Sequence, residues 1–171
     1  MHAEVECFLD RVRIRLADAW RGPVLELGSM DVNGSPRALF PDGTEYLGVD
    51  IEPGRGVDVV GLAHEAPTRP EGWALVISTQ ALEHDPHWRE TLAHAVRVLS
   101  PGGVLVVTAA APGTTPHGLD IWPDGYYRNL SEADLLGAVE AAGRPGQVLV
   151  RETIPTPDTA PISCLAWKAD G

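Results

Sequence analysis

The fold of this chain is decided by the stretch Val24-Leu25-Glu26-Leu27-Gly28-Ser29, an apolar run that ends in a glycine turn and contains one acid. A second apolar run, Tyr46-Leu47-Gly48-Val49-Asp50, follows about 20 residues later and ends in another acid. Two such strands form the front of a nucleoside pocket in doubly wound α/β folds, because the glycine lets the backbone approach a ligand and the acid accepts ribose hydroxyls. The two stretches therefore predict a ligand with an adenosine-like part.

Length, charge and cysteine content narrow the class of protein. A chain of 171 residues is long enough for one domain with a sizeable core. The formal net charge of −11 disfavours nucleic acid and membrane surfaces as partners, and no basic patch offsets it. The apolar runs are too short to cross a bilayer, and residues 1–20 lack the pattern of a secretory signal. We therefore expect a cytoplasmic protein in which Cys7 and Cys164 are reduced.

Helices and strands are predicted to alternate along the chain. Apolar residues at helical spacing from Val5 to Trp20 predict an N-terminal helix, and Ser35-Pro36 predicts the start of a short helix over residues 37–40. A longer helix is expected from Trp88 to Leu99, before a Ser-Pro-Gly-Gly turn. Further strands are expected at residues 57–60, 74–77 and 104–108.

The last part of the chain predicts a different connection. Ser131 and Asp134 form a capping-box pattern that begins a helix extending to Gly143. Residues 147–154 and 162–168 then read as two strands joined without a helix, which implies an antiparallel pair. The expected fold is α/β: a doubly wound, Rossmann-like, seven-stranded and mostly parallel sheet with an antiparallel last strand and helices on both faces.

Five stretches occur in order along the sequence: VLELGSMDVNG, YLGVDIEPG, DVVGLAHEAP, ALVISTQALEHD and RVLSPGGVLVVTAA. In this order and at these intervals they resemble the class I S-adenosylmethionine-dependent methyltransferases over residues 23–110. The Leu-Glu-His after the fourth strand and the Leu-x-Pro-Gly-Gly before the fifth are similar to the small-molecule, methyltransferase type 11-like branch. The resemblance implies that the chain binds S-adenosylmethionine and releases S-adenosylhomocysteine.

The resemblance also implies a division of the chain, taken as a single methyltransferase domain over residues 1–171. Its parts are an N-terminal helix (1–22), a cofactor-binding core (23–109), an acceptor-site loop (110–130) and a helix with closing strands (131–171).

Several residues acquire cofactor-binding roles from the resemblance. Gly28 and Ser29 would pass under the methionine portion, and Glu26 would position its ammonium directly or through water. Asp50 would hold the ribose hydroxyls, and Ile51 would lie against the adenine face.

The adenine edge departs from the family pattern. Leu62 and Ala63 would line this edge, and Ser78 and Thr79 would close the pocket from the fourth strand. Many relatives have an aspartate at the position of Leu62 to bind the adenine amino group. Adenine recognition would therefore depend on backbone groups or on His64.

The glycine loop departs as well. The family's G-x-G-x-G is replaced by Gly28-Ser29-Met30-Asp31-Val32-Asn33-Gly34, with the middle glycine lost and the last one displaced. Asn33 or Asp31 is expected to contact the amino-acid end of the cofactor. A nicotinamide-binding domain would require G-x-G-x-x-G, and the residues at positions 30 and 33 fail that test.

The irregular stretch 110–130 follows the fifth strand and is where relatives build the acceptor site. His117 is the candidate general base, because histidine titrates near neutral pH. Tyr126 or Asp120 would orient the acceptor. An exposed histidine with no catalytic role is the competing interpretation of His117.

Other candidate acceptor-binding residues flank this loop. Tyr126-Tyr127-Arg128 resembles a Tyr-Trp-Arg element of the branch, so Tyr127 and Arg128 are expected to bind the acceptor, and His84 is expected to border its pocket. Packing of the loop onto the sheet is the alternative role for these side chains. No metal site is expected at His84 and His87, because no matching cluster occurs elsewhere in the sequence.

The function implied is methyl transfer to a small-molecule acceptor by in-line displacement, with oxygen, nitrogen and carbon all open as the acceptor atom. A base is needed only for a hydroxyl or an ammonium. A non-catalytic cofactor-binding or regulatory domain is the alternative, favoured by the altered glycine loop and Leu62 and opposed by Asp50 and Leu82-Glu83-His84. A homodimer whose second subunit completes the site is compatible with the sequence.

Overall fold

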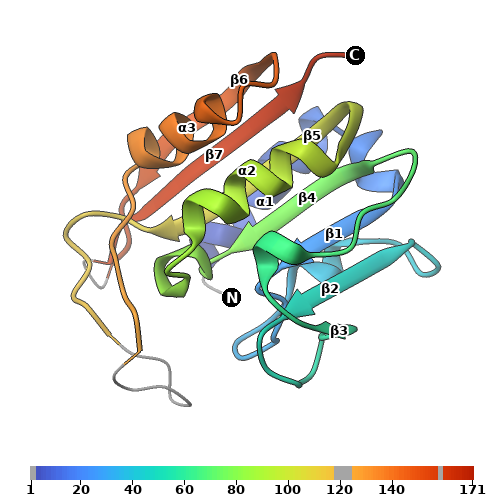
Figure 1. Ribbon diagram of the computed structural model, residues 1–171. Helices are drawn as coiled ribbons and strands as arrows, with labels where there is room; N and C mark the ends of the chain where they lie inside the picture. Colours follow the sequence, from blue (N-terminus) through green and yellow to red (C-terminus); the bar gives the residue numbers. More distant parts are fainter. Residues whose placement is uncertain (1–2, 118–124, 158–159) are drawn as a thin grey trace.

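The structure is a computed structural model that describes residues 3–117, 125–157 and 160–171. One seven-stranded sheet has the strand order β3-β2-β1-β4-β5-β7-β6 (Figure 1). The strands are β1 (Val24–Leu27), β2 (Tyr46–Asp50), β3 (Val59–Val60), β4 (Trp73–Thr79), β5 (Leu99–Ala110), β6 (Gly146–Ile154) and β7 (Ile162–Ala169). The first five are parallel, and β7 lies antiparallel between β5 and β6. The predicted mostly parallel sheet with an antiparallel closing strand is confirmed.

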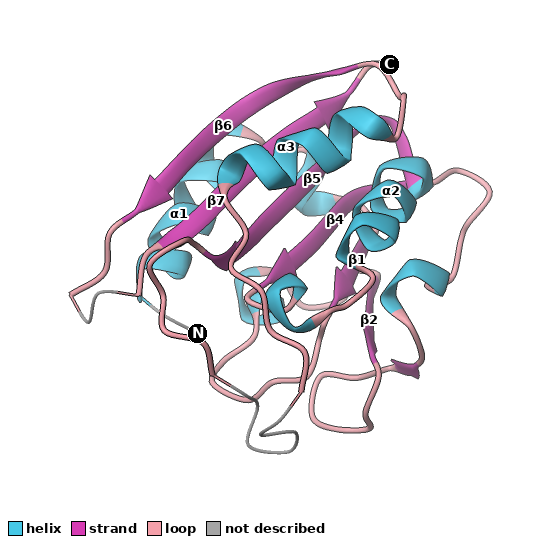
Figure 2. Cartoon of the chain, turned by 60° about the vertical axis from the view of Figure 1, so that its left-hand side comes forward, coloured by secondary structure: helices cyan, strands magenta, loops and turns pink. Residues whose placement is uncertain are grey.

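Helices cover both faces of the sheet (Figures 1 and 2). The α-helices are α1 (Ala3–Arg15), α2 (Trp88–Val98) and α3 (Glu132–Ala141). Short 3-10 turns are η1 (Ala19–Arg21), η2 (Pro36–Leu39), η3 (Ala63–Glu65) and η4 (Leu82–His84). Helix α1 covers one face, whereas α2 and α3 cover the other. Among the described residues no helix is both long and apolar enough to span a membrane.

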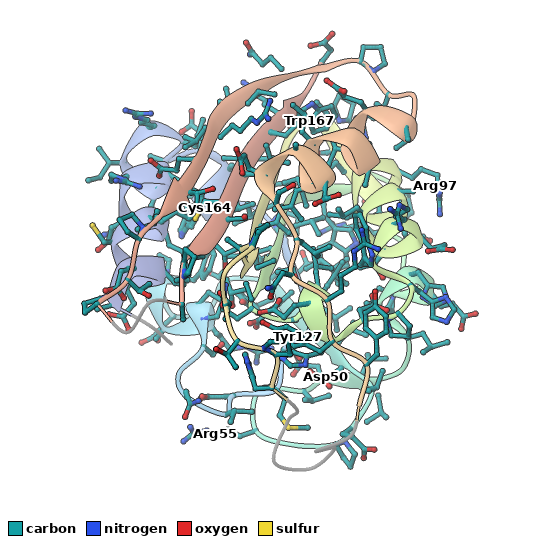
Figure 3. The ribbon with its side chains drawn as sticks, turned by 90° about the vertical axis from the view of Figure 1, so that its left-hand side faces the viewer. Asp50, Arg55, Arg97, Tyr127, Cys164 and Trp167 are labelled. Carbon is teal, nitrogen blue, oxygen red and sulfur yellow. The ribbon has the colours of Figure 1, made fainter. Side chains whose placement is uncertain are left out.

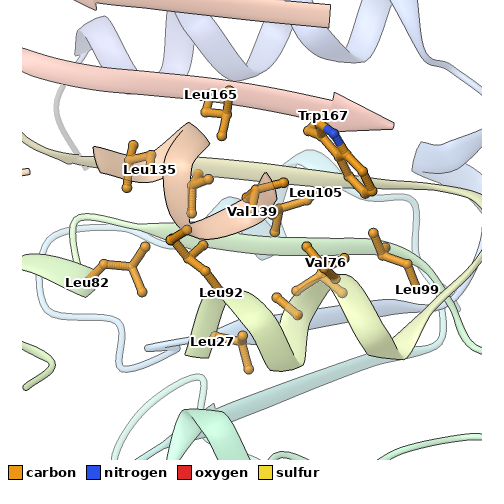
Figure 4. Packing of buried hydrophobic residues seen from close by; sticks show 14 of the residues in the cluster. Leu27, Val76, Leu82, Leu92, Leu99, Leu105, Leu135, Val139, Leu165 and Trp167 are labelled. Atoms are coloured by element: carbon orange, nitrogen blue, oxygen red, sulfur yellow. The ribbon is translucent and has the colours of Figure 1, made fainter. Parts of the chain in front are cut away.

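The two faces of the sheet bury separate cores because side chains alternate along each strand. In β4, Leu75 and Ile77 pack against the α1 face, while Val76 packs beneath α2. All three side chains are 0% exposed. Leu105 of β5 and Leu135 of α3 join the α2 face (Figure 4). A sheet buried on both faces accounts for the near-continuous apolar runs in the sequence.

Two predicted element boundaries are corrected by tertiary packing. The first helix ends at Arg15 rather than extending to residue 22, and Trp20 instead sits in η1, where it stacks on Phe40 with ring centroids 5.5 Å apart. Strand β5 begins at Leu99, so the Ser-Pro-Gly-Gly sequence lies within the strand. Leu99 pairs with Trp73 across a register shift in β4, which starts the ladder earlier than the apolar pattern suggests.

The connection from β1 to β2 contains no α-helix, only η2. Ser35 caps this turn by accepting the backbone N–H of Arg37, as the Ser-Pro sequence predicts. Leu39 and Phe40 then pack onto the α1 face.

Candidate functional site

The carboxyl ends of β2, β1 and β4 lie side by side at one edge of the sheet. After β1 the chain passes to the α1 face, whereas after β4 it passes through η4 into α2 on the opposite face. The point where the chain turns to opposite faces is the place where doubly wound sheets bind ligands. The predicted cofactor residues gather around this point.

Gly28 makes the turn that follows β1. Its φ is +77°, and its N–H donates to the carbonyl of Val49 at 2.9 Å. A Cβ added to Gly28 would lie 2.2 Å from the Cβ of Ala81, at the start of the loop after β4. Glycine is therefore required here both by the backbone conformation and by the close approach of two loops.

Asp50 ends β2 and is half-buried at the same edge. Its Oδ2 accepts the backbone N–H of Met30 at 2.9 Å, and its Oδ1 accepts the N–H of Glu52 at a longer 3.4 Å. Asp50 thus ties the glycine loop to the end of β2. Each oxygen keeps further lone-pair capacity for hydroxyl donors.

The rest of the glycine loop packs on the loop between β2 and β3. The N–H of Asp31 donates to the carbonyl of Arg55 at 2.8 Å, and the two side chains form an ion pair at 2.9 Å. Asp31 also accepts the N–H of Gly34 at 2.7 Å. Asn33 is exposed, whereas the carboxyl of Asp31 is engaged with Arg55 and Gly34.

Glu26 lies deeper, within β1, with 2% of its surface exposed. Its Oε2 accepts the hydroxyl of Tyr46 at 2.8 Å and that of Ser35 at 3.4 Å. Burial raises the pKa of the Glu26 carboxyl to about 8. Arg37 lies over the ring of Tyr46, 4.5 Å from the ring centre, but its ion-pair partner is Asp58.

Two buried serines at this edge have unpaired hydroxyls. Ser29 and Ser78 are 1% and 2% exposed, and neither hydroxyl has a hydrogen-bond partner among the described residues. Ile51, directly after β2, and Leu62, directly before η3, are 41% and 43% exposed. Ala63 begins η3, and Thr79 ends β4 opposite Thr108. Unpaired buried hydroxyls, acceptor carboxyls and exposed apolar side chains together fit a polar nucleoside ligand with one apolar ring.

Gln80, directly after β4, carries signs of a functional position that the sequence did not reveal. Its φ of 52° is the one positive value found for a non-glycine residue among those described. Its N–H donates to the carbonyl of Thr108 at 2.9 Å, and its side-chain amide donates to the Thr108 hydroxyl at 3.2 Å. Strained backbone of this kind clusters at ligand sites.

The acceptor-side candidates form a cluster of three rings: His84, His117 and Tyr127. Their ring centroids are 4.8 to 5.4 Å apart. Burial and the nearby His117 lower the pKa of His84, so this ring is neutral near pH 7. Tyr127 lies at the same end of the molecule as Asp50 (Figure 3). Its buried hydroxyl has no partner among the described residues, and burial raises its pKa to about 12.

Two other residues predicted on the acceptor side, Tyr126 and Arg128, lie outside this ring cluster. Tyr126 is 40% exposed and outside the ring cluster, so the structure brings Tyr127, not Tyr126, beside His117. The guanidinium of Arg128 lies over Trp88 of α2, 5.8 Å from the ring centre. Asp120 lies outside the described residues.

Glu83 is a second buried acid that the sequence interpretation did not assign to the site. It is 1% exposed, its carbonyl accepts the N–H of Arg128 at 2.8 Å, and its Oε1 accepts the N–H of Ala110 at 3.2 Å. Its Oε2 has no partner among the described residues, and burial raises its pKa to about 7. The feature of the sequence that could have pointed to Glu83 is its place in the Leu82-Glu83-His84 tripeptide.

Two cavities lined by described residues lie away from this edge. One, of about 270 Å³, lies between the loop around Arg69 and the end of α2. The other, of about 490 Å³, lies between α2 and α3. We place the candidate site at the carboxyl edge because the unpaired polar groups and the strained backbone are found there.

Comparison with known proteins agrees with this geometry. Residues 25–107 match the family model described as "Methyltransferase domain", which spans β1 through most of β5. No curated protein matches the chain.

Several solved structures share the fold. The 1,6-didemethyltoxoflavin-N1-methyltransferase of Burkholderia thailandensis, with bound 1,6-didemethyltoxoflavin and S-adenosylhomocysteine, has 15% identity and a TM-score of 0.67, over 98% of this chain and 85% of that one. The [4+2]-cyclase SpnF has 18% identity and a TM-score of 0.65, over 94% and 80%. A methyltransferase described as putative, in complex with the Trm112 activator of Haloferax volcanii, has 17% identity and a TM-score of 0.64, over 99% and 94%. These similarities confirm the fold, and the family match confirms the resemblance drawn from the motifs.

Proposed function

We propose that this S-adenosylmethionine-dependent methyltransferase acts on a small-molecule acceptor held between the carboxyl edge of β4 and β5 and the loop that follows β5. The observation that carries the proposal is the meeting of Gly28, Glu26 and Asp50 at the switch point of the sheet, within the residues that match the methyltransferase family model. The donor supplies an activated methyl group on a sulfonium. The chain therefore has mainly to hold the acceptor in line with it.

The glycine turn and the two acids would bind the donor from its amino-acid end to its ribose. Gly28 and Ser29 would pass under the methionine portion, and the unpaired hydroxyl of Ser29 supports a polar contact there. Glu26 would meet the ammonium and Asp50 the ribose hydroxyls. Asn33, exposed at the end of the glycine loop, would contact the carboxylate end.

The adenine would lie on the β3 side. The exposed apolar surfaces of Ile51 and Leu62 support an aromatic ring packed between them, with Ala63 at its edge. Ser78, whose hydroxyl is buried and unpaired, and Thr79 would close the pocket from β4.

The ring cluster would form the acceptor wall. His117 donates its Nδ1–H to the carbonyl of Thr115 at 3.1 Å in the tautomer that leaves Nε2 free to accept a proton. His84 and Tyr127 would orient the acceptor beside it, and Tyr126 and Arg128 would line the outer part of the loop. Asp120 is proposed as a further acceptor-binding residue. A neutral amine, thiolate or stabilised carbon would be methylated without this base, whereas a hydroxyl or ammonium would need it.

Binding of S-adenosylmethionine or S-adenosylhomocysteine to the purified chain tests this function. A ligand at 100 times its Kd stabilises a protein by about 2.7 kcal/mol, which corresponds to a rise in Tm of roughly 5 to 10 °C for a chain of this size. Asp50→Ala should abolish the shift. Asp50→Asn is the matched variant, because its amide oxygen still accepts the N–H of Met30, and it should bind more weakly than wild type but keep the loop in place.

Two results would count against the proposal. If neither compound raises the Tm, the proposed donor site is wrong. If Asp50→Ala binds with full affinity, the assignment of Asp50 to the ribose is wrong. A shift with NADH or NADPH instead would favour a nicotinamide-binding domain.

A non-catalytic cofactor-binding domain remains the second candidate function. It is favoured by the altered glycine loop, whose Asp31 is paired with Arg55. A fold of this kind also hosts other reactions, as the cyclase SpnF illustrates. Binding of the donor without transfer of a labelled methyl group to any member of a broad metabolite panel would favour this candidate.

The chain would act in the cytoplasm as a single domain over residues 1–171. A homodimer, in which a second subunit covers the acceptor loop, would complete the site. Light scattering with and without S-adenosylhomocysteine would reveal such a dimer.

A further inference from the structure

We propose that Glu26 recognises the α-ammonium of the donor by giving up a proton: it is a neutral carboxylic acid in the free chain, and binding of the ammonium ionises it. The inference rests on the donor site proposed above. It makes binding of any ligand with the amino-acid moiety a proton-releasing step. A ligand with the same adenosine part but no ammonium would leave Glu26 protonated.

The position of Glu26 within the sheet carries the first part of this inference. Glu26 is flanked by Gly48 of β2 and Ile77 of β4, and 2% of its surface is exposed. In the described part of the chain, the groups that donate to its carboxyl are two neutral hydroxyls, those of Tyr46 and Ser35. A buried carboxylate without a paired cation is costly, and such a group avoids the cost by taking up a proton.

Among the residues that the structure describes, the charged groups around Glu26 do not supply that cation. Arg37, from η2, attracts the carboxylate, but it is paired with Asp58, and its guanidinium lies 4.5 Å from the ring centre of Tyr46. Asp31, from the glycine loop, adds a negative charge that favours the protonated form. Burial outweighs the attraction of Arg37, and the pKa of Glu26 rises to about 8.

The same surroundings are prepared for the ionised form once a cation arrives. Hydroxyl groups that rotate freely can donate to both the acid and the carboxylate, so Tyr46 and Ser35 lose no hydrogen bond on ionisation. On binding, the O–H bond of the carboxylic acid breaks and its proton passes to solvent. The carboxylate left behind accepts an N–H of the ligand's ammonium, so net charge within the site balances.

Calorimetry with S-adenosylhomocysteine tests the inference without any methyl acceptor. The binding enthalpy is measured at pH 7 in buffers of different ionisation enthalpy, and the slope gives the number of protons released. We expect about 0.9 protons per ligand, the fraction of a group with a pKa of about 8 that is protonated at pH 7. The matched ligand is 5′-methylthioadenosine, which lacks the ammonium and should release none.

The affinity should depend on pH in the same way. Between pH 8 and pH 6 the affinity of wild type for S-adenosylhomocysteine should fall by about 50-fold, while that for 5′-methylthioadenosine should stay nearly constant. Glu26→Gln is the matched variant, because it keeps an acceptor for both hydroxyls but cannot ionise. It should bind S-adenosylhomocysteine more weakly with little dependence on pH, and it also reports any protons that the ligand itself exchanges.

The outcomes separate this inference from the function on which it rests. Binding of S-adenosylhomocysteine by wild type with no proton release, or with the same release for 5′-methylthioadenosine, would overturn the role of Glu26 but leave the donor site intact. No binding of either ligand would overturn the donor site itself. The wild-type measurement stands alone if Glu26→Gln does not fold.

Discussion

Gly28 shows how a single residue sets the shape of the carboxyl edge. Its positive φ turns the chain back over β2, and the absence of a side chain lets the loop after β4 approach. We predict that Gly28→Ala lowers the free energy of unfolding by about 3 kcal/mol, since it combines backbone strain with overlap against Ala81. Urea denaturation measures this loss.

Gly43 provides the matched control for Gly28. Its φ is +82°, but a Cβ added there meets nothing within 4 Å. Gly43→Ala should therefore cost only the strain term, about 1 kcal/mol, and leave binding of S-adenosylhomocysteine unchanged. Equal losses in the two variants would mean that the close approach of the loops at Gly28 is unimportant.

The sequence reveals some site residues better than others for a physical reason. Gly28 and Asp50 were predictable because their residue types, placed at strand ends, point directly to a turn and to a hydroxyl acceptor. Gln80 and Glu83 were not assigned, because the features that distinguish them are a strained φ and an unpaired oxygen in a buried site. Those features exist only after distant elements have packed together.

At the scale of elements, Glu83 joins three segments that are far apart in the sequence. It lies in η4, its side chain accepts the N–H of Ala110 at the end of β5, and its carbonyl accepts that of Arg128 in the acceptor loop. Together with the bond from the N–H of Leu130 to the carbonyl of Ala110, these contacts of Glu83 fix where the acceptor loop returns to the sheet.

Substitution of Glu83 should separate its hydrogen bond from its charge. Glu83→Ala leaves the Ala110 N–H buried and unpaired and opens a cavity, so we expect a loss of about 3 kcal/mol in unfolding free energy. Glu83→Gln keeps an acceptor oxygen and should stay within about 1 kcal/mol of wild type at pH 7. Denaturant midpoints of the two variants give the comparison, and equal destabilisation would show that the carboxyl group itself is required.

Element boundaries were predictable where local chemistry decides them. Ser131 and Asp134 form the capping box at the start of α3, with reciprocal side-chain to backbone bonds, as their spacing predicts. The end of α1 was not, because helical spacing continues to Trp20 while stacking on Phe40 draws that residue into a separate turn. A long-range contact outweighed the local periodicity.

At the scale of the whole molecule, the sequence pattern gave the number and type of strands but not their order. Nothing in the spacing of β6 and β7 shows that β7 lies between β5 and β6. That order follows from the antiparallel pairing of residues 104–110 of β5 with residues 162–168 of β7, in which Thr108 lies opposite Cys164. The insertion leaves the carboxyl ends of β1, β2 and β4 free of the closing strands.

This arrangement of the strands predicts which segments a bound ligand stabilises. S-adenosylhomocysteine should slow amide hydrogen exchange at residues 26–31, 48–52 and 78–84, because binding stabilises the loops that converge at the switch point. Exchange in β6 and β7 should change little, since these strands are held by their own ladder on the far side of β5. Asp50→Ala should remove the protection at all three segments together. Protection centred on the groove between α2 and α3 instead would move the ligand site away from the carboxyl edge.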